Sequence, residues 1–270
     1  MNNSIRKAVG IFSLSAALLP AALYADTSDS WEFGASIYGW FPDISGSTAF
    51  PHGGGGDFTV PVGDILDKLQ FTFQGSFDAR KGSWGFITDV IYMDMGETKT
   101  GFNEGTIGGS GIPADVTGAV GFDMKSWIWT TAGYYRLVDQ PQAAFDLLAG
   151  LRYTDVEQSL HWSFSGDIGQ LPLPGPEGRA EVSADYWDAI IGVRGRFAFG
   201  NDGSWFLPYY FDVGTGDSDF TWQAVAGLGY AFGWGDVAAV WRYLDYDLPS
   251  GKPIGDMDFS GPAIGAVFRW

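Results

Sequence analysis

The chain has 270 residues, and its 32 acidic against 15 basic residues give a formal net charge of −17. Such an acidic chain lacks the basic surface that binding to nucleic acid or to an anionic membrane surface requires. Cysteine is absent, which excludes disulfides and thiolate metal sites, and we expect no metal centre and no cofactor. The 40 glycines and the aromatic content of 17% exclude a disordered chain and are typical of membrane β-barrels.

Residues 1–25 have the pattern of a secretory signal peptide. Arg6 and Lys7 precede an apolar stretch over residues 8–23, and a suitable cleavage site follows. An uncleaved membrane anchor is the alternative, but serine and proline interrupt the apolar stretch. We therefore expect cleavage, export, and a single domain over residues 26–270.

Apolar and polar residues alternate through most of the remaining chain, as they do in a β-strand with two different surroundings. In the clearest segment, Phe73 and Phe77 fall on one face, while Gln74 and Asp78 fall on the other. The same alternation predicts ten strands, near residues 31–41, 69–80, 83–95, 118–137, 143–162, 181–199, 203–213, 219–232, 235–247 and 257–270.

The connections between these strands are of two lengths. Long loops are expected at residues 42–68, 96–117 and 163–180, and short links join the strands at the other end. This asymmetry predicts a closed up-and-down antiparallel transmembrane β-barrel, most simply with ten strands and within a range of eight to twelve. A secreted β-sandwich or jelly roll is the alternative, but it needs neither the loop asymmetry nor two aromatic bands.

The apolar face of each predicted strand has aromatic residues near its ends. In an outer-membrane barrel such residues form girdles at the two edges of the lipid-facing band. The predicted girdle consists of Phe71, Phe73, Phe77, Tyr153, Trp187, Trp205, Tyr209, Trp222, Tyr230 and Trp241.

The opposite face carries charges that would point into the barrel. These charges have two interpretations, a selectivity ladder in a pore or a salt-bridged plug that fills the interior. We favour the plug, because side chains nearly fill a barrel of about this size. The predicted lumen charge network consists of Asp78, Arg80, Asp89, Asp146, Arg152, Asp188, Arg194, Arg196, Asp212 and Arg242, with Arg269 on the same face.

Several segments resemble the small OmpA-like and opacity-protein-like outer-membrane barrels of Gram-negative bacteria. They are Asp146–Tyr153, Trp187–Arg196, Phe220–Tyr230, Trp241–Asp245 and the terminal Phe268-Arg-Trp270. The resemblance implies an outer-membrane location, with the long loops extracellular and both termini periplasmic. It also implies contacts with outer-membrane lipids, lipopolysaccharide and the outer-membrane assembly machinery. Phe268 and Trp270 resemble the terminal assembly signal, although family members more often end in Phe.

Only two histidines are present, and one of them suggests a catalytic arrangement. His161 and Ser163 are predicted on one strand face, at the outer end of the fifth strand, with Glu157 or Glu177 as an orienting group. This placement resembles the histidine and serine of outer-membrane lipid hydrolases, in which histidine deprotonates the serine nucleophile. The asparagine-bearing context of those enzymes is missing, so an ordinary histidine near the membrane interface is the simpler interpretation.

The loop at 42–68 contains four consecutive glycines followed by acidic residues. No lysine and no serine or threonine follow in the pattern of a phosphate-binding loop, so that interpretation fails. The acids of this loop and Glu97, Glu104 and Asp115 of the next loop suggest weak calcium binding at most. A solvated surface loop is the simpler interpretation.

Taken together, these patterns predict a monomeric, non-enzymatic outer-membrane barrel with acidic surface loops. Its expected role is in surface interaction or envelope integrity, without nucleic-acid partners. A narrow channel for ions or small solutes is the first alternative, and a lipid hydrolase that uses His161 and Ser163 is the second.

Overall fold

The computed structural model describes residues 30–48, 56–60, 69–106, 113–168, 171–249 and 254–270. In the outer parts of several strands it describes the backbone alone. Every regular element in the described residues is a β-strand. This part of the chain contains no helix long and apolar enough to cross a membrane.

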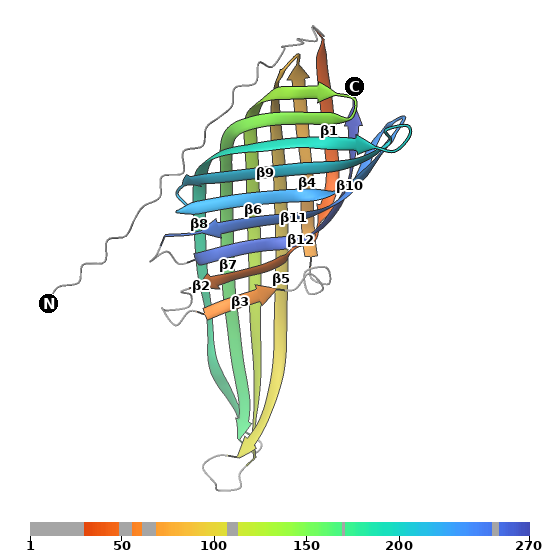
Figure 1. The fold of residues 1–270 in the computed structure, drawn as a ribbon. Coiled ribbons are helices and arrows are strands. Elements are labelled where there is room, and N and C mark those ends of the chain that lie inside the picture. The colour runs from red at the N-terminus through yellow and green to blue at the C-terminus, as the bar shows by residue number, and fades with distance from the viewer. Residues whose placement is uncertain (1–29, 49–55, 61–68, 107–112, 169–170, 250–253) are drawn as a thin grey trace, which may run out of the picture.

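The strands form one antiparallel sheet that closes on itself (Figure 1). Closure comes from β1 and β12, which pair from Gly34 with Arg269 to Trp40 with Ala263. The described residues contain twelve strands; β2 and β3 form an added hairpin, which leaves ten in the barrel wall. The wall strands are β1 (Trp31–Trp40), β4 (Leu69–Lys81), β5 (Trp84–Thr106), β6 (Pro113–Gln140), β7 (Ala143–Ile168), β8 (Leu171–Phe199), β9 (Trp205–Gly216), β10 (Phe220–Phe232), β11 (Gly235–Asp247) and β12 (Ile254–Arg269). The predicted ten-stranded closed barrel is confirmed.

Two of the three predicted long loops are wrong, because the chain continues as strand through most of them. β5 and β6 stay paired as far as Thr106 with Pro113, and β7 and β8 as far as Ile168 with Leu171. The four strands β5–β8 therefore project well beyond the rest of the wall (Figure 1). We call residues beyond Met95 in β5, and the parts of β6–β8 paired at that level, the β5–β8 extension.

The third predicted loop, at 42–68, contains the hairpin of β2 (Asp43–Thr48) and β3 (Gly56–Val60). β2 pairs with β12, the strand that also pairs with β1, so β2 extends the edge that β1 forms along β12. Phe41 bridges the two strands by donating its N–H to the carbonyl of Pro262 at 3.0 Å. The remaining residues of the predicted loop lie outside the described part of the chain.

Short turns, the start of β1 and the end of β12 gather at one end of the barrel, which we call the termini end. The turn between β4 and β5 places Gly82 at a φ of 59°, and the turn after β8 places Gly200 at a φ of 88°. Side-chain-bearing residues rarely adopt such positive angles, so glycine suits these tight reversals. The opposite end, where β5–β8 project, is called the loop end.

Candidate functional site in the barrel lumen

Charged side chains fill the lumen near the termini end. Asp146 of β7 lies between two arginines, accepting from Arg136 Nε at 2.7 Å and from Arg194 Nε at 3.1 Å. Arg194 also donates to Asp78 of β4 at 2.5 Å, so the group spans the lumen. Its guanidinium lies 3.9 Å from the centre of the Tyr134 ring. A charge-assisted network of this kind links wall strands that do not touch through their backbones.

A second ionic group crosses the middle of the lumen. Arg152 of β7 donates to Asp212 of β9 at 2.5 Å, and both side chains are fully buried. Nearby, Arg242 of β11 donates to Asp89 of β5 at 3.0 Å and to the Tyr38 hydroxyl at 3.1 Å. Such buried charges are retained only when partners satisfy them, and each of these has an ion-pair partner, although Asp212 Oδ1 accepts no hydrogen bond.

Of the ten charges predicted for the lumen network, the structure places nine in ion pairs. The exception is Asp188, whose carboxylate accepts from the backbone N–H and the hydroxyl of Ser218 at 3.0 and 2.8 Å. Asp188 thereby holds the turn between β9 and β10. The nine paired residues are Asp78, Arg80, Asp89, Asp146, Arg152, Arg194, Arg196, Asp212 and Arg242.

Sequence reasoning missed several partners of these charges. Arg80 pairs with Glu32 at 2.5 Å and with Asp139 at 2.7 Å, and Asp236 takes both Arg196 and Arg269. Arg136 continues the alternation of the buried Ala132 and Tyr134, so its inward position was a usable signal, and the register shift of β6 comes only after it. For Asp236, the alternation within β11 was a usable signal, since it lies six residues before Arg242 on the same face.

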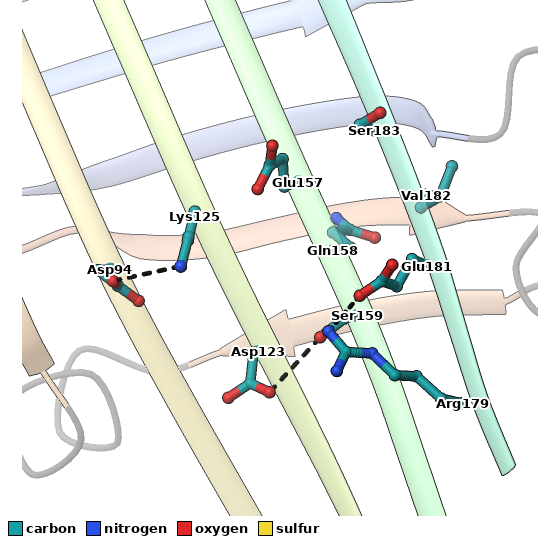
Figure 2. Close-up of a pocket in the computed structure, with 10 residues that line it drawn as sticks. All are labelled: Asp94, Asp123, Lys125, Glu157, Gln158, Ser159, Arg179, Glu181, Val182 and Ser183. Atoms are coloured by element: carbon teal, nitrogen blue, oxygen red, sulfur yellow. Dashed lines mark hydrogen bonds and ion pairs between the residues drawn. The ribbon is translucent and has the colours of Figure 1, made fainter.

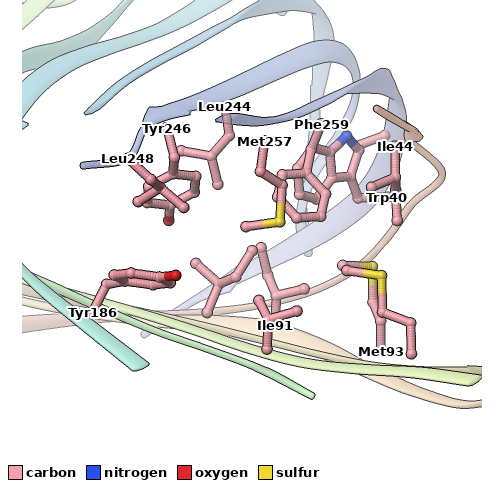
Figure 3. Close-up of a cluster of buried hydrophobic side chains, with 14 residues drawn as sticks. Trp40, Ile44, Ile91, Met93, Tyr186, Leu244, Tyr246, Leu248, Met257 and Phe259 are labelled. Carbon is pink, nitrogen blue, oxygen red and sulfur yellow. The ribbon is translucent and has the colours of Figure 1, made fainter. Parts of the chain in front are cut away.

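The loop half of the lumen is apolar, which corrects the expectation of charge along the whole inward face. Side chains from β11, β12 and the β1–β2 segment meet others from β5–β8 across the lumen (Figure 3). Ser126 and Gln158 are buried at the same level, with Ser126 Oγ and Gln158 Nε2 lacking hydrogen-bond partners, and packed apolar side chains fill the rest of it. The apolar cluster comprises Trp40, Ile44, Ile91, Met93, Met124, Ile128, Val156, Tyr186, Leu244, Tyr246, Leu248, Met257, Phe259 and Ala263.

Trp40 joins the apolar cluster to the ionic group beneath it. The Arg242 guanidinium lies 4.8 Å from the centre of the Trp40 ring, and the indole donates to the carbonyl of Gly261 at 3.3 Å. Within the described residues, the lumen is therefore crossed first by ion pairs and then by packed apolar side chains. This arrangement is suited to holding a rigid wall and is unsuited to passing ions.

The outward face carries two aromatic bands. Towards the loop end, Tyr92 packs on Trp127 and Tyr153 on Trp187, with ring centres 4.6 and 4.7 Å apart. Towards the termini end, Trp205 packs on Tyr230 at 5.1 Å. The structure leaves outward, and at least partly exposed, Phe73, Phe77, Tyr153, Trp187, Trp205, Tyr209, Trp222, Tyr230 and Trp241 of the predicted girdle, whereas the side chain of Phe71 lies outside the described part.

Beyond the loop-end aromatic band, the outward face becomes charged. A groove of about 460 Å³ lies there on strands β5–β8 (Figure 2). Lys125 in the groove lies 3.8 Å from Asp94, and Arg179 pairs with Glu181. Lys125 and Arg179 remain 52% and 68% exposed, so water solvates both cations. The change from aromatic to charged residues marks one edge of the apolar belt.

The remaining predicted site residues have separate positions. His161 and Ser163 lie within β7, five or more residues before its end at Ile168, so their placement at the outer end of the strand is wrong. Their side chains lie outside the described part, as do those of Glu97, Glu104 and Asp115. Phe268 packs on Trp234 at 5.5 Å, and Trp270 exchanges two backbone hydrogen bonds with Phe33.

The chain is similar to solved outer-membrane barrels. The outer membrane protease OmpT of Escherichia coli aligns with a TM-score of 0.54 and 10% identity, covering 90% of this chain and 98% of that one. The translocator domain of the autotransporter NalP from Neisseria meningitidis gives 0.33 and 14% identity, covering 91% of each chain. No protein-family model and no curated protein matches the chain. At such low identity, the likeness to OmpT establishes the fold alone.

Proposed function

We propose that this chain is a bacterial outer-membrane barrel with a closed lumen, which acts through its surface and not as a pore or an enzyme. The observation that carries the proposal is the obstruction of the lumen by the Arg152–Asp212 and Arg242–Asp89 pairs and by the apolar cluster. Ion-paired and tightly packed interiors stabilise a wall but offer no hydrated path.

The outward face supports the membrane location. Aromatic bands bound an exposed apolar belt in which side chains such as Ile191 and Ile264 are 65% and 56% exposed. Such a belt would associate or aggregate in water, whereas lipid tails accommodate it. Its partners in this proposal are outer-membrane lipids and lipopolysaccharide, with Phe268 and Trp270 recognised by the assembly machinery.

In this proposal, the β5–β8 extension is the surface through which the protein acts outside the cell. It lies at the loop end, opposite the start of β1 and the end of β12, and an outer-membrane barrel of the OmpA-like or opacity-protein-like kind would present that end to the exterior. Surface interaction or support of the envelope follows from a rigid barrel that holds a projecting four-stranded sheet. We expect the protein to work as a monomer.

The absence of cysteine allows a direct test of location and orientation. Ser183→Cys introduces a thiol on the exposed outward face of β8, and Asn201→Cys introduces one in an exposed turn at the termini end. A membrane-impermeant maleimide should label Ser183→Cys on intact cells, and Asn201→Cys only after the outer membrane is permeabilised. Labelling of Asn201→Cys alone on intact cells would reverse the orientation, and labelling of neither variant after permeabilisation or of both before it would refute the proposed placement.

A further inference from the structure

The lumen contains one cavity that neither the ion pairs nor the apolar cluster fills. Its volume is about 230 Å³, and its lining comes from every wall strand except β7 and β8. We call it the lumen chamber, and define it by Ser36, Ile87, Val225, Ala238, Gly265 and Val267.

Small side chains create the chamber. β11 presents Ala238 to it, and Ala238 pairs across the sheet with Gly229 on one side and Gly265 on the other. A barrel of this size needs large inward side chains to fill its interior, so the small side chain of Ala238 leaves space here. The ring of Phe206 covers Gly229, and Tyr38 lies against Gly265.

Most polar groups around the chamber already have partners, but the buried hydroxyl of Tyr210, which also lines it, has none. The hydroxyls of Ser36 and Ser76 bond to each other at 2.5 Å, and the Tyr38 hydroxyl donates to Asp89 at 2.6 Å. Arg242 is shared between Asp89 and Gln223, whose carbonyl oxygen it reaches at 2.6 Å. Committed groups offer few hydrogen bonds to water, to an ion or to a sugar, so the chamber suits an uncharged and mainly apolar occupant.

The chamber is closed towards the loop end. Along β11, Ala238 and Val240 precede Arg242, and along β5, Ile87 precedes Asp89, so the Arg242–Asp89 pair limits the chamber on that side. The apolar cluster lies beyond the pair. The route left to an occupant passes the ion pairs of Asp78 and Asp236 at the termini end.

From this geometry we propose that the lumen chamber is a binding site for a small, uncharged, apolar molecule of the size of a substituted benzene ring. An apolar cavity of about 150 Å³ binds benzene in a soluble protein, and this chamber exceeds that volume. The proposal goes beyond the closed-lumen function, since a closed barrel without a ligand would still serve as a surface protein.

The alanines of β11 provide a matched pair of variants. Ala238 faces the chamber, whereas its neighbour Ala239 is exposed on the outward face. Ala238→Phe places a ring inside the chamber, and Ala239→Phe places the same ring against lipid. The two variants therefore carry the same substitution on the same strand and differ only in whether the new ring enters the chamber.

The test uses ¹⁹F NMR to measure the binding of fluorobenzene to the full-length protein in lipid nanodiscs. Heat-modifiable gel migration checks that each protein is folded. We expect a saturable bound fraction with the natural chain and with Ala239→Phe, and at least a tenfold weaker one with Ala238→Phe. Non-saturable partition that is equal in all three proteins would overturn the proposal. If Ala238→Phe fails to fold, Ala238→Leu takes its place with the same expectation.

Discussion

The Arg152 guanidinium and the Asp212 carboxylate meet inside the barrel at 2.5 Å, with neither side chain exposed to solvent. They come from β7 and β9, which are separated in the wall by β8. Arg152 also donates to the hydroxyls of Thr130 and Thr221, both at 3.3 Å, so one side chain links β6, β7, β9 and β10. The pair therefore fixes wall strands that lack direct backbone contact, at the middle of the lumen.

We predict that Asp212→Ala lowers the free energy of unfolding by about 3–5 kcal/mol, because it leaves the Arg152 charge buried without its partner. Urea unfolding in lipid vesicles, followed by the heat-modifiable gel band, measures the change. Asp202→Ala, in an exposed turn, is the control and should cost far less. The double variant Arg152→Met with Asp212→Leu should recover most of the loss, since it removes both charges together. Equal costs for Asp212→Ala and Asp202→Ala would show that the buried pair has no special role.

The side chain of Gln74 completes the seam between β1 and β4. Their backbone pairing ends at Ile37 with Gly75, and there the Gln74 carboxamide takes over. It accepts from the Trp40 N–H at 2.5 Å and donates to the Trp40 carbonyl at 3.2 Å. Gln74→Ala leaves both buried backbone groups unsatisfied, so we expect a loss of about 1–3 kcal/mol.

Gln142→Ala, at an exposed turn position, is the matched control for Gln74→Ala and should leave stability nearly unchanged. The same vesicle unfolding measurement applies to both variants. Amide hydrogen exchange at Trp40 adds a local readout, and it should become faster in Gln74→Ala alone. Unchanged exchange at Trp40 would argue that β1 is held by other contacts.

The turn after β8 gives a pH-dependent prediction outside the membrane. The Ser204 hydroxyl and backbone N–H donate to Asp202 at 2.7 and 3.1 Å, and these bonds hold the pKa of Asp202 below its ordinary value. The stabilisation is present above the ordinary pKa and is lost as pH falls through the lowered one. Ser204→Ala should raise the pKa of Asp202, as followed by its ¹³C side-chain shift, whereas Ser83→Ala should leave it unchanged. No change in Ser204→Ala would contradict this cause.

Ser163 tests the enzymatic alternative. We expect that Ser163→Ala leaves phospholipid and lipopolysaccharide turnover unchanged in cells that express the protein, because the proposed role requires no nucleophile. Comparison with the natural chain, at matched amounts of folded protein, provides the measurement. A loss of turnover in Ser163→Ala, repeated in His161→Ala, would instead favour the hydrolase.

Much of the barrel was predictable because its two surroundings impose an alternation on every wall strand. The prediction failed for residues 97–106, where glycine, threonine and charged residues resemble a loop, yet pairing with β6 continues. The apolar cluster was also missed, since residues such as Ile91 and Ile128 lie in runs that are apolar on both faces. The partner of each charged residue could not be predicted from alternation, because alternation assigns a residue to a face of its strand but does not say which residue lies opposite it in the lumen. That depends on the register between strands.

The closed lumen is tested most directly by single-channel recording from the purified, refolded protein in a planar lipid bilayer. A general porin in the same membrane supplies the positive control, and the heat-modifiable gel band confirms that the inserted protein is folded. The structure predicts no steady unitary current at any applied voltage that the bilayer withstands. A reproducible unitary current, altered in size by Arg152→Ala or Arg242→Ala, would show that the lumen conducts and would contradict the account.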